Sequence, residues 1–93
     1  MRELRLDDFA GNVGQTYNIV FSDGVLPLVL EQAQPLPAGQ REAGAFRLQF
    51  LGPPEPVIVQ GTYPFRLGEE TDEIFIVPIG KGEDGVQYEA IFI

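Results

Sequence analysis

Apolar residues recur at every second position along most of this chain, and glycine and proline separate the runs. The clearest run spans residues 57–67, where Tyr63 and Phe65 share the apolar side and Arg66 lies on the other. Such alternation is typical of a β-strand with one buried face. Similar runs occupy residues 16–22, 25–30, 45–51, 74–79 and 86–93. The pattern predicts an all-β fold, either a small antiparallel barrel or a two-sheet sandwich of five to six strands.

The pair Asp23-Gly24 predicts a tight turn between the first two strands, because both central positions of such a turn need positive φ. This turn places Ser22 opposite Val25 and sets the rest of the register. The expected pairs are Phe21 with Leu26, Ile19 with Leu28, and Tyr17 with Leu30. All of these apolar residues then lie on one face of the hairpin.

The last two strands are apolar on both faces. If Ile79 faces Val86, then Phe75 and Val77 join Ile79 on the core face, and Ile74 lies opposite Ile91 on the other face. A strand with two apolar faces is central, covered by another element, or part of an interface. The candidate interaction residues are Val25, Val29, Ile74, Ile76, Ile91 and Ile93. Ordinary packing within the fold is the rival interpretation of the same residues.

The remaining segments complete one expected domain over residues 1–93. Residues 7–13 predict a short helical turn with Asp7 as its N-cap and Gly14 as its stop. Its apolar residues Leu4, Leu6, Phe9 and Val13 should face the sheet. The Pro- and Gly-rich residues 34–44 predict a mobile loop.

The net charge of −8 limits the classes of partner that the protein can bind. An acidic surface repels phosphate backbones and anionic lipid, so we expect neither nucleic acid nor membrane as a partner. A basic protein partner, a cation or simple solubility would each suit this charge. The first residues lack the apolar region of a secretory signal, and the longest apolar stretches are far shorter than the roughly 20 residues of a membrane span. We therefore expect a cytoplasmic protein.

Few residues could carry chemistry. The chain has no His and no Cys, so the commonest general base and metal ligands are missing. Ser22 and Lys81 are the only residues of their types, and both lie at expected turns. The acidic run 69–73 lacks the spacing of a calcium loop. We expect no catalytic residue, metal or cofactor. A carboxylate-based hydrolase is the third hypothesis.

The stretch around Tyr63 supports a second hypothesis from another class. The aromatic rings of Tyr63 and Phe65 could form a ligand platform, and a small-ligand or sugar-binding β domain would use Tyr63, Arg66 and the 34–44 loop. Tyr63 and Arg66 are the candidate ligand-binding residues. A core role for the ring is the alternative, because aromatic residues at period 2 are usually buried.

Five motifs together resemble a small bacterial domain family of unknown function. They lie in residues 4–17, 46–50, 60–65, 74–80 and 88–92, so the resemblance covers nearly the whole chain. It implies a short single-domain protein that is often encoded beside phage tail-collar-like proteins. It therefore suggests an accessory of a tail-type or secreted particle, with the products of adjacent genes as candidate partners. The predicted function is a non-enzymatic interaction or structural module that binds a protein or itself.

Overall fold

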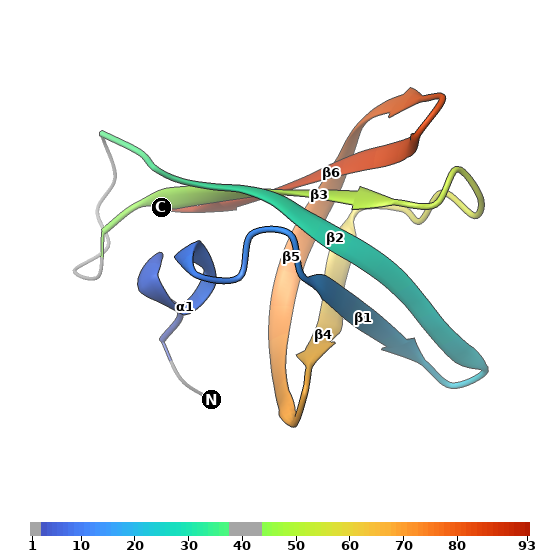
Figure 1. Ribbon diagram of the computed structural model, residues 1–93, viewed down its shortest axis with the longest axis horizontal. Helices are drawn as coiled ribbons and strands as arrows, with labels where there is room; N and C mark the ends of the chain where they lie inside the picture. The colour runs from blue at the N-terminus through green and yellow to red at the C-terminus, as the bar shows by residue number, and fades with distance from the viewer. Residues whose placement is uncertain (1–2, 38–43) are drawn as a thin grey trace.

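Six antiparallel strands form a closed barrel, and a short helix lies at one end of it (Figure 1). This computed structural model describes residues 3–37 and 44–93. The elements are α1 (Asp7–Ala10), β1 (Thr16–Phe21), β2 (Gly24–Pro35), β3 (Phe46–Gly52), β4 (Gly61–Leu67), β5 (Glu70–Gly82) and β6 (Gly85–Phe92). The strand order around the barrel is β1-β2-β3-β6-β5-β4. The predicted all-β class is confirmed, and of the two predicted architectures the barrel is the one formed.

Two long strands make the closure possible, because each changes its neighbour partway along. The first half of β2 pairs with β1 and its second half pairs with β3. In the same way, β5 pairs first with β4 and then with β6. Both strands carry a register shift, at Leu30/Gln32 in β2 and at Pro78/Gly80 in β5. A bulge bends a strand and increases its twist, so the two hairpins turn away from the β3–β6 layer.

The barrel closes through a short seam between β1 and β4. Only two residue pairs form it, Asn18 with Arg66 and Ile19 with Phe65. On β4, Pro64 lies next to Phe65, just beyond the last pair of the seam. Pro64 has no N–H group to donate to a further ladder hydrogen bond. Ile19 and Phe65 are both buried, so packing inside the barrel supports the few hydrogen bonds of the seam.

Phe9 of α1 closes one end of the barrel. Its ring lies 6.2 Å from that of Tyr17, 6.0 Å from Phe46 and 6.3 Å from Phe92. Phe9 and Leu4 are buried, as predicted, whereas Val13 is 48% exposed and does not face the sheet. The helix is also shorter than predicted. Its N-cap is Leu6 rather than Asp7, and the carboxylate of Asp8 accepts a hydrogen bond from the backbone N–H of Arg5 at 2.8 Å.

The register of the first hairpin differs from the prediction by two residues. The observed pairs are Phe21 with Gly24, Val20 with Val25, Ile19 with Leu26, and Tyr17 with Leu28. The turn therefore consists of Ser22 and Asp23, and Gly24 supplies the positive φ of 154°. No other residue type has positive φ among the described residues, so Asp23 does not adopt the conformation that the predicted turn requires. A shift of two residues keeps every side chain on its predicted face.

The predicted faces of β5 are wrong. Ile74 and Ile76 are fully buried inside the barrel, whereas Phe75 is 50% and Ile79 47% exposed. The register is Val77 with Glu89 and Pro78 with Tyr88, one residue away from the prediction, and Ile79 is the extra residue of the bulge. A shift of one residue exchanges the two faces of a strand, which explains the reversal.

Two connections also differ from the sequence pattern. Strand β4 begins only at Gly61, so Val57 and Val59 lie outside it and are exposed. Strand β2 extends to Pro35 into the predicted mobile loop. Most of that loop, residues 38–43, lies outside the described residues.

Gly85 offers a test of the close approach between β3 and β6. A Cβ atom at this position would collide with the carbonyl oxygen of Gly52, and its φ of +140° is one that other residues rarely adopt. We expect Gly85→Ala to lower the free energy of unfolding by about 2–4 kcal/mol through crowding and backbone strain. Chemical denaturation measures the change.

Gly82→Ala is the matched control, because Gly82 pairs with Gly85 and has open space at its Cβ position. Its stability should change by less than about 1 kcal/mol. Equal losses in the two variants would contradict the proposed collision.

Candidate functional site

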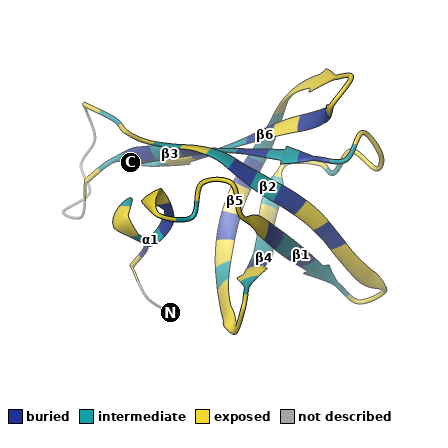
Figure 2. Ribbon diagram, viewed as in Figure 1, coloured by how far each residue is buried: buried dark blue, intermediate teal, exposed yellow. Residues whose placement is uncertain are grey.

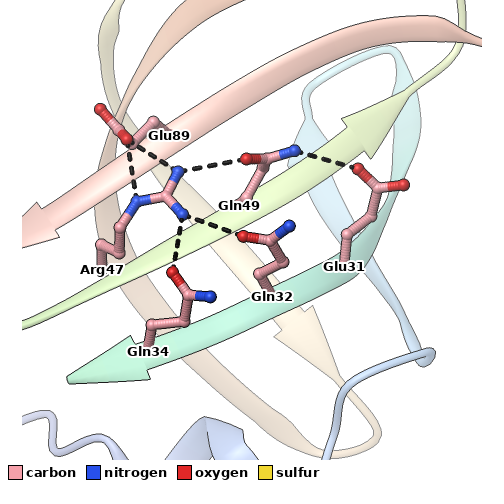
Figure 3. A network of polar contacts seen from close by, with 6 residues as sticks. All are labelled: Glu31, Gln32, Gln34, Arg47, Gln49 and Glu89. Atoms are coloured by element: carbon pink, nitrogen blue, oxygen red, sulfur yellow. Dashed lines mark hydrogen bonds and ion pairs between the residues drawn. The ribbon is translucent and has the colours of Figure 1, made fainter.

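The most extensive polar cluster is centred on Arg47, on the outer face of the barrel (Figure 3). Its Nε and Nη2 atoms donate to Oε2 of Glu89 at 3.0 and 2.8 Å. Nη1 donates to Gln32 at 3.0 Å and to Gln34 at 3.2 Å, and Nη2 also donates to Gln49 at 3.1 Å. A guanidinium has five N–H groups, and all of them are used here. Arg47 therefore has no donor left for a ligand.

The cluster joins three neighbouring strands. Arg47 and Gln49 lie on β3, Gln32 and Gln34 on β2, and Glu89 on β6. Gln49 extends the network by donating to Glu31 at 3.4 Å. Cross-strand pairs of this kind stabilise a sheet, and a charged partner strengthens each hydrogen bond. The arrangement is that of a structural clamp.

Tyr63 and Arg66, the predicted ligand-binding pair, do not form a common site. They lie on opposite faces of β4, because side chains alternate along a strand. The hydroxyl of Tyr63 donates to the carbonyl oxygen of Val59 at 2.7 Å, and its ring packs edge-on against Phe21 with centroids 5.9 Å apart. Arg66 is exposed.

Two tyrosine hydroxyls order the connection between β3 and β4. Tyr63 binds Val59, and the hydroxyl of the fully buried Tyr88 accepts a hydrogen bond from the N–H of Ile58 at 3.1 Å. Ile58 packs against the core, so Val57 and Val59 on either side of it point outward. Both hydroxyls thus have structural partners within the chain.

A hollow at the α1 end of the barrel gathers several acidic residues. It is lined by Asp8, Phe9, Asn12, Tyr17, Phe65, Leu67, Glu70 and Asp72. Asp8, Glu70 and Asp72 already have interaction partners. The run 69–73 does not converge on one point, because alternation along β5 turns Glu70 and Glu73 to opposite faces. Within residues 3–37 and 44–93, no group of three or more potential metal ligands occurs.

A second hollow lies at the turn between β5 and β6. Its lining is Glu31, Leu51, Gly80, Lys81, Gly82, Glu83, Asp84, Gly85 and Gln87. Lys81, Glu83 and Asp84 are all exposed, so these charged groups keep their contact with water. This hollow offers no desolvated lysine for covalent chemistry.

The predicted interaction residues divide into two groups. Ile74 and Ile76 have no exposed surface and belong to the core, so they contribute to no interface. Val25, Ile91 and Ile93 are exposed, and Val29 is half-buried. The β1–β2 turn next to Val25 and the C-terminal end of β6 lie far apart in the barrel, so these residues do not form one patch (Figure 1). The role of the exposed residues in association stays a prediction.

The sequence pattern missed other exposed apolar residues. They are Val13, Val57, Val59, Phe75 and Ile79. Pro78 was the available signal for Ile79, since a proline inside a paired strand often accompanies a bulge. Figure 2 shows exposed and buried segments alternating along β5.

The fold and these surfaces define a class of protein: a small six-stranded β-barrel domain that displays apolar side chains on an acidic exterior. Residues 4–92 match the family described as "Domain of unknown function (DUF6916)", and the chain belongs to this family. No curated protein and no solved structure matches the chain. None of the helices in the described residues has the length and apolar character needed to cross a membrane.

The clamp provides a stability test. We expect Arg47→Lys to lower the free energy of unfolding by about 1–2 kcal/mol, because one ammonium group cannot reach Glu89 and the glutamines of β2 together. Thermal and chemical denaturation measure the loss. Arg66→Lys is the control, since Arg66 is exposed and surface substitutions usually change stability by less than about 0.5 kcal/mol. A variant at Arg47 as stable as the control would show that the network contributes little.

Proposed function

We propose that this protein is a non-enzymatic interaction module. The observation that carries the proposal is the set of large apolar side chains left exposed on strands of a barrel whose interior is already filled. Scattered apolar residues are normal on a protein surface. Several half-exposed valine, isoleucine and phenylalanine side chains on one small domain favour contact with another macromolecule.

The polar groups support the same proposal. Arg47 uses its donors within the sheet, and the hydroxyls of Tyr63 and Tyr88 bind the β3–β4 connection. None of these three residues lines either hollow, and each has a structural role. The geometry therefore lends no support to the alternative ligand-binding role of Tyr63 and Arg66.

We propose the assembly from the resemblance described in the sequence analysis, which implies phage tail-collar-like neighbours. On this ground we propose an accessory role in a phage-tail-like or secreted assembly. We place the protein in the cytoplasm until it joins that particle. Its partners would be the products of adjacent genes or a second copy of the chain.

Co-expression with each product of the adjacent genes, followed by size exclusion with light scattering, tests the proposal. We expect the protein to elute with at least one neighbour or as an oligomer. Ile91→Asp should weaken the complex about tenfold or more, because it places a charge on an exposed apolar position of β6.

Val13→Asp is the matched control, since Val13 is 48% and Ile91 46% exposed, and Val13 lies outside the sheet. Melting temperatures of both variants close to that of the unsubstituted protein would show that both remain folded. A protein that stays monomeric with every neighbour would contradict the proposal.

A further inference from the structure

Three apolar side chains form a stripe along the outer face of β5. We call Phe75, Val77 and Ile79 the β5 stripe. Phe75 is 50% and Ile79 47% exposed, and Val77 is half-buried. On the opposite face of the same strand, Ile74 and Ile76 are fully buried. Strands that are apolar on both faces are typical of sheets covered on both sides, and here one side is covered by the barrel interior.

Each part of β5 is paired on one side. Phe75 is paired with Thr62 of β4, and Val77 with Glu89 of β6. An added partner would pack its side chains onto the outer face, with Thr62 and Glu89 at the rim.

The charge around the stripe indicates the chemistry of its partner. Glu69 and Glu73 lie before Phe75, and Glu83 and Asp84 lie after Ile79, and all four are exposed. Glu70 and Asp72 alternate with Glu73 and therefore share the inner face of the strand with Ile74. The only cation within residues 68–85 is Lys81, so the two ends of the stripe together carry four exposed carboxylates and one lysine. Two further cations face this sheet, Arg66 on β4 and Arg47, and Arg47 is bound to Glu89.

A second copy of the chain fits this surface poorly. Because both ends of the stripe are acidic, either orientation of a second copy would bring carboxylates against carboxylates. Like charges across an interface are unfavourable, whereas opposite charges speed association and select the partner. Basic side chains on both sides of an apolar centre complement the whole length of the stripe.

We propose that the outer face of β5 binds a protein segment that has an apolar centre flanked on both sides by Lys or Arg. The inference rests on the proposed function, in which the protein is an interaction module, and it names the surface and the chemistry of the partner. The apolar centre would cover Phe75 and its neighbours, and the basic flanks would meet the acidic turns at the two ends of β5. An apolar centre with a polar rim is the usual anatomy of a protein interface.

Two synthetic peptides of equal length test the proposal on the isolated protein. Both have the same centre of alternating valine and threonine, and one carries lysines at each end where the other carries glutamates. Binding is measured by fluorescence anisotropy at low and at high salt, and the binding site is mapped by amide chemical shifts. We expect the lysine peptide to bind, its shifts to centre on β5, and its affinity to fall as salt rises.

Phe75→Thr should weaken this binding at least about tenfold, because an exposed aromatic residue at the centre of an interface usually dominates the affinity. Val25→Thr is the matched control, since Val25 is also apolar and exposed (58%) but lies on β2. Glu73→Gln should weaken binding less and reduce its salt dependence.

Four results would overturn the inference: no binding of the lysine peptide, equal binding of the glutamate peptide, an equal loss in the Val25 variant, or self-association that Phe75→Thr abolishes. The last result would assign the stripe to a second copy and leave the proposed function intact. If a neighbour complex forms normally with Phe75→Thr while no peptide binds, the inference also fails and the proposed function stays intact. If neither a complex nor peptide binding is found, both the inference and the proposed function fail.

Discussion

The bending of two long strands is the constraint on which this barrel depends. Strands β2 and β5 each serve two neighbours, and a sheet with six strands closes only if both of them turn partway along. The register shifts at Leu30/Gln32 and Pro78/Gly80 accompany these turns. The seam of two residue pairs between β1 and β4 is short because the curvature of the other strands has already brought these edges together.

The same bend determines what the exterior of the barrel presents. The bulge at Ile79 sets which side of β5 faces inward, so Ile74 and Ile76 fill the core and Phe75 is left outside. Closure of the fold and exposure of an apolar stripe therefore have one structural origin. The stripe is a functional candidate because the fold already buries enough apolar surface without it.

Much of the fold could be predicted from the sequence, because period-2 alternation states which side of each strand is apolar. The rule holds for β3, where Phe46, Leu48 and Phe50 are all fully buried. It fails for β5, since a strand that is apolar on both sides gives no signal for its inner face. The clamp around Arg47 was not predictable, because it requires β2, β3 and β6 to be neighbours. The turn at Ser22 and Asp23 was misplaced, because local propensity for Asp-Gly competed with the pairing that the barrel imposes.

The aromatic contacts at the α1 end have a consequence for how this domain joins others. Phe9 lies 6.3 Å from Phe92, and Phe92 stacks on Phe46 at 4.4 Å, so α1 and the C-terminal end of β6 meet at one end of the barrel. The hairpin tip between β5 and β6 lies on the side of the barrel away from the C-terminus (Figure 1). A polypeptide fused after Ile93 would leave the barrel at the end that α1 closes, away from the tip of the β5–β6 hairpin.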